Sequence, residues 1–197
     1  METQNQLQTD KERFIEIAKT NITRDGIEAV MKYLDNSDFY TAPASTQYHN
    51  AYDGGLLNHS LNVYDSLLKI NDAFNLNLKP EFMAISALFH DVCKINVYVK
   101  GSRNRKNALG QWEAVTVWDF DDQFPLGHGE KSVIMLQSLG LRLTKNELYA
   151  IRWHMGGFDA ATKGGDRGQN KAYEQSPLAA ALHMADMAST YLTEPRN

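Results

Sequence analysis

The stretch Leu88-Phe89-His90-Asp91-Val92-Cys93-Lys94 lies where an apolar helical run gives way to polar residues. In mid-helix, adjacent side chains such as His90 and Asp91 point about 100° apart and would not share a partner. At a helix end, however, the chain can bend both toward one centre. An imidazole beside a carboxylate is a suitable pair of ligands for a divalent metal. The stretch therefore predicts a metal site at the end of a helix.

Length and charge set broad limits on the function. A chain of 197 residues suits one domain with a sizeable core. Its 20 basic and 24 acidic residues give a net charge of −4, which argues against a large basic surface for nucleic acid. The single cysteine, Cys93, excludes an intrachain disulfide and fits a reducing compartment. The N-terminus is polar and the apolar runs are short, so we expect a cytoplasmic protein that does not enter the membrane.

Apolar residues recur at helical spacing through most of the chain. Helices are expected over residues 10–19, from a cap at Thr23 past Leu34, and over 56–73, 80–90, 128–138, 144–154 and 176–188. The capping box Thr144–Glu147 opens the second-last of these helices. Residues 36–53 and the glycine-rich residues 155–175 are expected to form loops.

Between Ile95 and Phe120 the apolar period changes to that of strands, which predicts a β-hairpin. Its turn region is expected to carry four basic residues: Lys100, Arg103, Arg105 and Lys106. A clamp for substrate phosphates and a solvated hairpin tip are equally good interpretations of these residues. The predicted fold class is an all-α helical bundle with a small β-hairpin insertion. Residues 1–39 would be a helical extension of the main domain, residues 40–197, in one compact unit.

Potential metal ligands follow one another along the chain at or near expected helix ends: His59, His90, Asp91, His128, His154 and Asp186. One histidine beside an apolar face is more often a packed core residue than a ligand, so the inference depends on their joint occurrence. Imidazole nitrogen and carboxylate oxygen suit Mn²⁺, Fe²⁺, Co²⁺, Ni²⁺ or Zn²⁺. Six ligands exceed the need of one open site, but would serve two metals bridged by one aspartate.

Sequence context adds to this pattern. Five segments occur in the order GGLLNHSLNV (54–63), ALFHDVCK (87–94), LGHGEKSVIML (126–136), AIRWHMGG (150–157) and LHMADMAST (182–190). Over residues of about 40 to 190, the chain resembles the HD-domain superfamily of metal-dependent phosphohydrolases. With APASTQYHNAYDGGLLNHS (42–60), it most resembles the catalytic HD domain of YhaM-type 3′→5′ exoribonucleases.

The resemblance implies roles for particular residues. Metal ligands common to HD domains would be His59, His90, Asp91 and Asp186. Members that hold two metals have two further histidines, which match His128 and His154, and Asp91 would then bridge. Lys94 matches a lysine that meets a substrate phosphate or assists proton transfer.

The sequence also departs from the family. Cys93 stands where relatives usually have glycine, and His49-Asn50 stands where two histidines are common. His49 is still a candidate for substrate binding or for protonating the leaving group. No oligonucleotide-binding β-barrel fits into residues 1–39, so processive degradation of RNA is not implied.

The sequence therefore predicts a metal-dependent phosphohydrolase or phosphodiesterase, of class EC 3.1. It would act on a nucleotide, a dinucleotide or a short single-stranded nucleic acid through a metal-bound hydroxide. Two divalent ions are expected as cofactors, drawn from Mn, Fe, Co, Ni, Mg or Zn. The alternatives are a 3′→5′ exonuclease and a non-catalytic nucleotide-binding sensor, with a di-iron oxygenase as a remote third. The sequence leaves the oligomeric state open.

Overall fold

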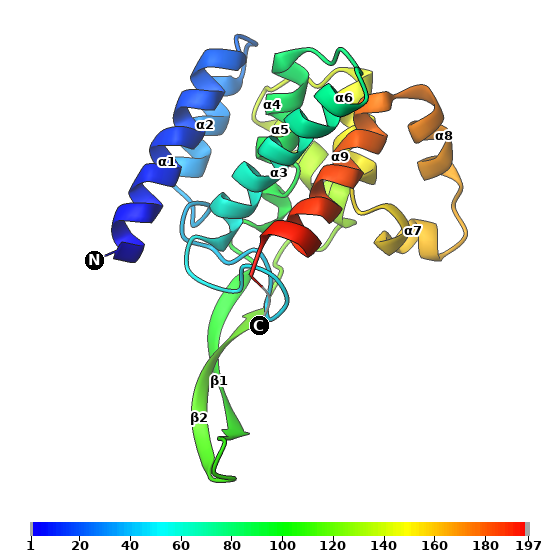
Figure 1. Cartoon of the computed structure of the whole chain (residues 1–197). Coiled ribbons are helices and arrows are strands. Elements are labelled where there is room, and N and C mark those ends of the chain that lie inside the picture. The colour runs from blue at the N-terminus through cyan, green and yellow to red at the C-terminus, as the bar shows by residue number, and fades with distance from the viewer. Residues whose placement is uncertain (1, 196–197) are drawn as a thin grey trace.

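In the computed structural model, which describes residues 2–195, a bundle of helices carries a two-stranded arm (Figure 1). The α-helices are α1 (Glu2–Asn21), α2 (Ile27–Asp35), α3 (Gly55–Ala73), α4 (Pro80–Phe89), α5 (His128–Ser138), α6 (Lys145–Trp153), α7 (Ala160–Lys163), α8 (Gly168–Gln175) and α9 (Pro177–Ala188). Two 3₁₀ helices, η1 (Val92–Lys94) and η2 (Gly156–Phe158), and a π-helix, η3 (Ser189–Thr193), complete the helical elements. The predicted helical fold with a hairpin is confirmed.

Helix α4 lies at the centre of the bundle and packs against α1, α3, α6 and α9. Its residues from Met83 to Phe89 are all buried, as expected for a helix that is apolar on every side. Leu57 and Leu61 of α3 and Leu182 of α9 belong to the same core. The C-terminal end of α4, where His90 and Asp91 follow, is therefore enclosed by the other helices.

Helix α1 is longer than its apolar residues predict, because it begins at Glu2 and not at Asp10. Side-chain hydrogen bonds from Gln6 to Asp10 and from Gln8 to Glu12 link successive turns of this polar segment. At its buried face, Phe14 packs edge-on against Phe89 of α4. The N-terminal extension and the main domain thus share one core.

The expected cap of α2 at Thr23 is wrong. The residue before the helix is Gly26, whose φ of 92° favours glycine, and a Cβ there would come within 2.4 Å of the backbone of Gly140. The Thr23 N–H instead donates to Glu81 of α4. By contrast, the predicted capping box of Thr144 and Glu147 is confirmed.

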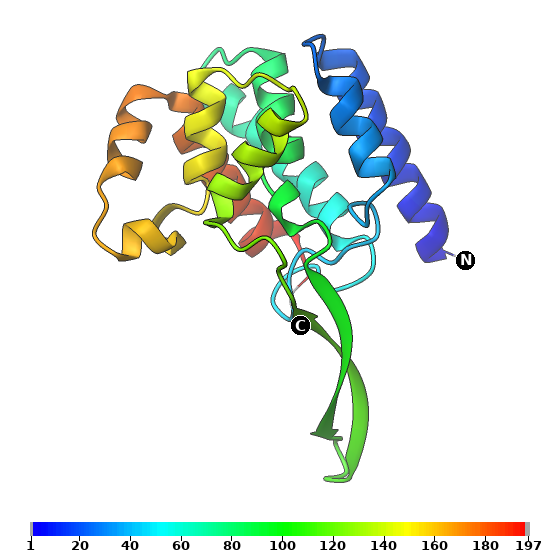
Figure 2. The same ribbon diagram turned by 180° about the vertical axis from the view of Figure 1, so that it is seen from behind.

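The arm consists of β1 (Tyr98–Lys106) and β2 (Trp112–Phe120), paired antiparallel from Tyr98↔Phe120 to Lys106↔Trp112. Both views show it projecting from the helical body (Figures 1 and 2). The prediction that the basic residues occupy the turn is wrong, since all four lie within β1. The turn follows them, where the Asn107 side chain accepts hydrogen bonds from the N–H groups of Leu109 and Gln111.

The glycine-rich residues 155–175, expected to be a loop, in fact form η2, α7 and α8. The side chain of Asp159 caps α7 by accepting from the N–H groups of Ala161 and Thr162. Helix α8 is tied to the bundle by its buried Ala172 and by a hydrogen bond from the Tyr173 hydroxyl to the Trp153 carbonyl. Across residues 2–195, no helix is long and apolar enough to cross a membrane.

Candidate metal centre

The six predicted metal ligands come from five parts of the chain and meet at one place. Helix α3 carries His59 near its start, and α9 carries Asp186. His90 and Asp91 follow α4, His128 begins α5 and His154 follows α6. His59, His90, Asp91 and His154 are almost completely buried, whereas His128 and Asp186 are partly open. The folded chain thus gathers donors that are up to 127 positions apart, from 59 to 186.

Asp91 lies at the middle of this cluster, and its two carboxylate oxygens face different histidines. Oδ2 lies 3.6 Å from Nε2 of His59 and 3.5 Å from Nε2 of His90. Oδ1 lies 2.7 Å from Nε2 of His128 and 3.4 Å from Nε2 of His154. One carboxylate thus has a pair of imidazoles on each side, which is the arrangement that a bridging ligand requires.

The side of Asp91 that faces His59 holds a further carboxylate. Oδ1 of Asp186 lies 3.3 Å from Nε2 of His59, and the Nε2 atoms of His59 and His90 are themselves 3.3 Å apart. Three potential ligand atoms, two imidazole nitrogens and one carboxylate oxygen, thus lie close together on this side. A divalent cation among them would balance the carboxylates and satisfy the imidazoles.

The outer nitrogens of two histidines fix the orientation of their rings. Nδ1 of His90 donates to the carbonyl of Ala87 at 2.8 Å, and Nδ1 of His154 donates to that of Ile151 at 2.7 Å. Both carbonyls lie in the last turn of a helix, where they lack a partner within the helix. A proton on Nδ1 leaves Nε2 as a lone-pair donor toward the cluster.

Nε2 of His154 gives the clearest indication that these residues fit a cation. It is buried and has no hydrogen-bond partner in the part of the chain that the structure describes, although it lies 3.4 Å from Oδ1 of Asp91. Leaving a buried polar atom unpaired costs about 1–3 kcal/mol. A metal ion would use this lone pair, so the residues present fit a divalent metal.

The carboxylates of Asp91 and Asp186 are both ionised at neutral pH. Burial alone would raise the pKa of Asp91, but Lys94 and the imidazoles of His90 and His128 hold it well below its usual value. Burial likewise opposes ionisation of Asp186, and the hydrogen bond from His59 brings its pKa well below the usual range. The two ionised carboxylates supply charged oxygen ligands for a divalent cation.

The histidines differ in protonation. Burial lowers the pKa of His90 to about 3, so its imidazole is neutral at neutral pH. Burial also disfavours the charged forms of His59 and His128, but close neighbours raise the pKa of each to about 10. These neighbours are Asp186 and Glu194 for His59, and Cys93 and Asp91 for His128. A metal that binds to these two histidines would displace a proton from each.

Lys94 lies beside the central carboxylate because η1 turns the chain directly after Asp91. Its Nζ is 2.7 Å from Oδ2 of Asp91. Burial would lower the pKa of Lys94, yet Asp91 raises it above its usual value, so the amine is charged. Cys93, the middle residue of η1, is buried, and its N–H donates to the Ser132 hydroxyl.

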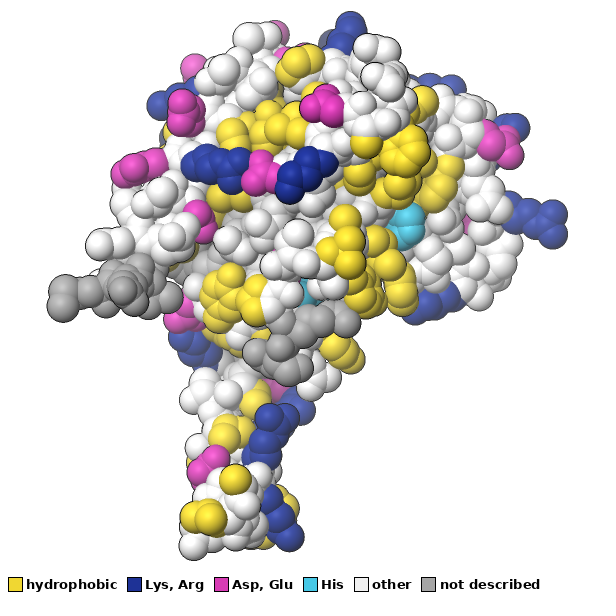
Figure 3. Space-filling view, in the orientation of Figure 1, with side chains coloured by type: hydrophobic (Ala, Val, Ile, Leu, Met, Phe, Trp, Pro, Cys, Tyr) yellow, Lys and Arg dark blue, Asp and Glu magenta, His cyan; other side chains and the backbone are white. Residues whose placement is uncertain are grey.

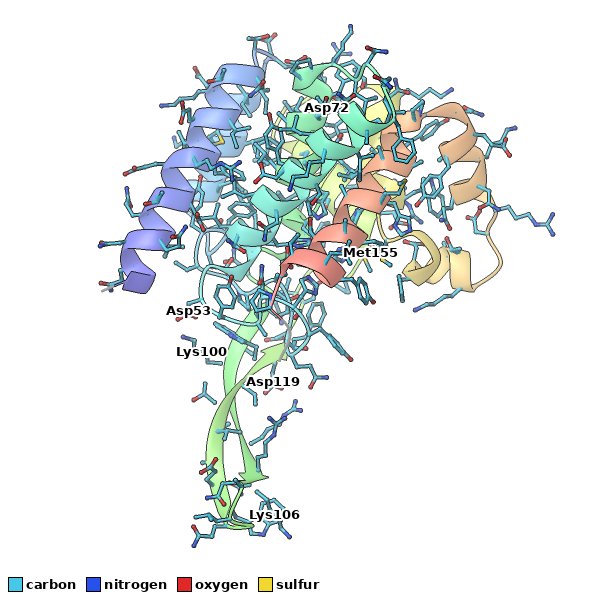
Figure 4. All side chains as sticks on the ribbon, viewed as in Figure 1. Asp53, Asp72, Lys100, Lys106, Asp119 and Met155 are labelled. Atoms are coloured by element: carbon cyan, nitrogen blue, oxygen red, sulfur yellow. The ribbon has the colours of Figure 1, made fainter. Side chains whose placement is uncertain are left out.

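A cavity of about 540 Å³ opens onto the cluster. Asp91, Lys94, His128 and Asp186 line its inner end. Its walls are largely aromatic and thioether groups, from Tyr48, Met155, Phe158, Met187 and Tyr191, with Lys163 among them. Figure 4 labels Met155 beside α9. Water-accessible metal ligands at the end of a partly apolar cavity are typical of a site that binds a small organic molecule.

Comparison with known proteins assigns the chain to a family. The family profile of the HD domain matches residues 56–190. The chain belongs to the HD-domain family.

The HD domain also has a distant curated relative. Over 63 residues, the chain is 32% identical to the dihydroneopterin 2′,3′-cyclic phosphate phosphodiesterase of Methanocaldococcus jannaschii. The matched stretch covers 30% of this chain and 25% of that protein. No solved structure matches the chain. The closer resemblance to YhaM-type exoribonucleases stays a prediction.

His49, predicted to meet the substrate, lies in the HD domain's cavity. Its ring centre is 5.0 Å from that of His59. Burial lowers the pKa of His49 to about 4, so its ring is neutral at neutral pH. A neutral imidazole can bind a substrate but is a poor acid for a leaving group.

The four basic residues of the arm do not line this cavity. Lys100 instead pairs with Asp53 at 3.1 Å and lines a separate cavity at the base of the arm. Arg103 pairs with Asp119 of the opposite strand, while Arg105 is exposed. Lys106 lies near the far end of the arm (Figure 4). Any contact of theirs with substrate would lie outside the metal centre.

One residue of the centre is absent from the sequence-based prediction. The Glu194 carboxylate accepts a hydrogen bond from Nδ1 of His59 at 2.8 Å and is buried. Glu194 follows η3 in a polar segment with no apolar spacing and no family motif. No local signal marks it, because its contact with His59 joins positions 135 residues apart.

Proposed function

We propose that the protein is a metal-dependent phosphohydrolase that cleaves phosphodiesters of a nucleotide, a dinucleotide or a short single-stranded nucleic acid. The observation that supports this most is the position of Asp91, with two imidazole nitrogens facing each carboxylate oxygen. Membership of the HD-domain family supports the same chemistry. The matched Methanocaldococcus protein is named as a phosphodiesterase, and this favours a phosphate diester as the substrate.

Two divalent ions, of Mn, Fe, Co, Ni, Mg or Zn, would be held by this set. His59, His90 and Asp186 would serve one ion, His128 and His154 the other, and Asp91 both. When bound, such ions stabilise charge on a phosphate and make a nucleophile available from water at neutral pH. The imidazoles without a proton on Nε2 and the ionised carboxylates are the forms that bind metals.

The remaining residues of the cavity would bind and orient the substrate. The charged Lys94 amine lies between the metal ligands and the cavity, where it would contact a non-bridging oxygen of the phosphate. Tyr48, Phe158 and Met187 would enclose the organic part of the substrate and exclude water. A volume of about 540 Å³ lies within the usual range for small-ligand pockets, about 300–1,000 Å³, and favours a nucleotide over a long polymer.

A specific feature of the arm favours the second candidate, 3′→5′ exonuclease action. Residues opposite each other in an antiparallel pair share a face, and the register pairs Lys100 with Trp118 and Lys106 with Trp112. Both pairs lie on the same face, and the residues of that face between them, Ser102, Asn104, Ala114 and Thr116, carry no charge. Aromatic rings beside cations are a surface on which single-stranded nucleic acid can stack.

Hydrolysis of a generic phosphodiester tests the proposal. Purified protein with Mn²⁺ should hydrolyse bis-p-nitrophenyl phosphate, and Asp91→Ala should abolish this activity because it removes a ligand from both ions. Asp72→Ala is the matched control, since Asp72 is exposed on the part of the body away from the arm (Figure 4). Activity that survives in Asp91→Ala would contradict the site. Metal and nucleotide binding without turnover in the wild type would favour a sensor.

Chain length separates the two enzymatic candidates. Turnover of labelled oligonucleotides that rises with their length favours exonuclease action. Equal turnover of mononucleotide diesters and oligonucleotides favours a small substrate.

A further inference from the structure

The segment after α9 brings a carboxylate against the outer side of the metal centre. Here the chain forms the π-helix η3, in which the N–H of Glu194 bonds to the carbonyl of Ser189 at 3.0 Å. The hydroxyls of Ser189 and Ser66 are 3.0 Å apart and join the start of η3 to α3. A π-helical turn holds one more residue than an α-turn and is frequent at functional sites. It brings Glu194 back against α3, beside His59.

The Glu194 carboxylate is completely enclosed. Oε1 accepts from Nδ1 of His59 at 2.8 Å and from the amide of Asn62 at 3.3 Å. The side chain of Glu194 is 0% exposed, and no described residue forms a hydrogen bond with its second oxygen, Oε2. Nε2 of His49 is also buried without a partner among the described residues, and His49, His59 and Glu194 offer atoms within 4.8 Å of one another. A fully buried carboxylate with so few partners is costly for stability alone.

The partners of the outer nitrogens differ among the four histidines of the centre. His90 and His154 donate to helix carbonyls, which are neutral and fixed by the backbone. His128 has Nδ1 3.4 Å from the sulfur of Cys93. His59 alone among these four has a carboxylate as its outer partner in the part of the chain that is described. A carboxylate behind a metal-binding histidine orients the ring and makes its other nitrogen a stronger donor.

We propose that Glu194 is a positioning residue that acts through His59 and strengthens the binding of a divalent metal to the centre. Glu194 keeps the proton of His59 on Nδ1 and directs Nε2 toward Asp91 and Asp186. The segment that follows α9 thereby contributes to the metal site without contacting the metal. This inference rests on the proposed function only in requiring that the centre binds a metal.

Calorimetric titration of the metal-free full chain with Mn²⁺ tests the inference. Glu194→Ala should weaken Mn²⁺ binding by about 10–100-fold, the usual effect of removing such a partner. Glu194→Gln keeps an acceptor for Nδ1 but not the charge, so its affinity should lie between those of Glu194→Ala and the wild type. The control is Glu16→Gln, which alters an exposed glutamate of α1 and should leave the affinity unchanged.

A second readout separates positioning from general stabilisation of the fold. In the Zn²⁺-loaded protein, nitrogen-15 spectra should show His59 protonated on Nδ1 in the wild type and in Glu194→Gln. In Glu194→Ala this proton should exchange with water faster, because its acceptor is gone.

The outcomes are distinct. If Glu194→Gln and Glu194→Ala bind Mn²⁺ as tightly as the wild type, Glu194 has no positioning role, while the proposed function stands. If Glu194→Ala does not fold, unchanged affinity in Glu194→Gln overturns the inference and a loss of threefold or more supports it. A wild type that binds no metal overturns both proposals.

Discussion

Asp91 divides the metal centre into two halves, and the halves can be tested separately. His154 belongs to the half with His128, and its buried Nε2 has no hydrogen-bond partner among residues 2–195. His154→Ala should therefore reduce the bound metal from two ions to one, with the ion at His59, His90 and Asp186 retained. Metal analysis after dialysis measures this. Retention of two ions by the variant would remove His154 from the ligand set.

The control for this change is His183→Gln. His183 is outside the cluster, and its Nδ1 bonds to the backbone carbonyl of His154. Its replacement should leave the number of bound ions unchanged.

Lys94 should affect turnover more than metal binding. Its amine pairs with Asp91 and lines the cavity, where it would stabilise charge that develops on the phosphate. Loss of one such group typically costs about 10²–10³ in kcat. Lys94→Met should show a loss of this order against bis-p-nitrophenyl phosphate, with the metal content of the wild type. Lys106→Met is the control, and a normal kcat for Lys94→Met would exclude the role.

The predicted ligands could be found from the sequence because each lies in a short segment with a recognisable neighbourhood. The order of those segments was enough to predict that His59, His90 and Asp186 lie together. Glu194 could not be found in this way, since a hydrogen bond across 135 residues leaves no periodic or local trace. The partner of the outer nitrogen of a histidine depends on tertiary packing alone.

Among the elements, periodic segments were predicted well and irregular ones poorly. The core helices α3, α4, α5, α6 and α9 follow from apolar spacing, and the capping box of Thr144 fixes the start of α6. Helices α7 and α8 were not predicted, because the glycines of residues 155–175 favour a loop. Asp159 and Tyr173 stabilise these helices through contacts that composition does not reveal. Similarly, the turn of the arm depends on the Asn107 side chain and not on the basic residues before it.

The arm should contribute to binding of nucleic acid and not to the chemistry. Figure 3 shows basic and apolar side chains exposed along it. Trp112 is 68% exposed and has the Lys106 amine 5.3 Å from its ring centre. A double change, Lys106→Ala with Trp112→Ala, should weaken the binding of a short labelled single strand by about tenfold, since stacking on one aromatic is worth about 1–3 kcal/mol. Hydrolysis of bis-p-nitrophenyl phosphate should stay at the level of the wild type.

Arg105→Ala is the matched control, because Arg105 lies on the other face of the arm, opposite Glu113. Equal strand binding by the double variant, the control and the wild type would show that the arm does not bind nucleic acid.

At the scale of the whole molecule, Arg24 joins the N-terminal helices to the main domain. Its guanidinium donates to Glu147 of α6 at 2.6 Å and to Glu81 of α4 at 2.9 Å. Glu147 is completely buried, so removal of Arg24 leaves an anion short of a partner. Arg24→Met should reduce the free energy of unfolding by about 2 kcal/mol, the value of a hydrogen bond to a charged group. Urea denaturation measures this, with Arg105→Met as the exposed control.

The contact between Arg24 and Glu81 predicts how the stability of the fold changes with pH. Burial would raise the pKa of Glu81, but Arg24 lowers it below 4.5, its ordinary value. A carboxylate whose pKa is lower in the folded state stabilises the fold fully when the pH is above its ordinary pKa. This stabilisation is lost as the pH falls through the pKa of the folded state. The wild type should thus lose more stability on acidification below 4.5 than Arg24→Met does. Parallel losses in the two proteins would mean that Glu81 and Arg24 are not coupled.

The arm is attached to the helical body by two neighbouring segments of the chain. The N–H of Asp121 donates to the carbonyl of Val97 at 2.8 Å, so the two chain segments that enter and leave the arm lie side by side. The six proposed metal ligands all come from the helical body and its connections, and none comes from the arm. The turn at residues 107–111 is therefore a suitable insertion point for protein engineering. A fluorescent domain or an affinity tag inserted there would lie well away from the candidate metal centre.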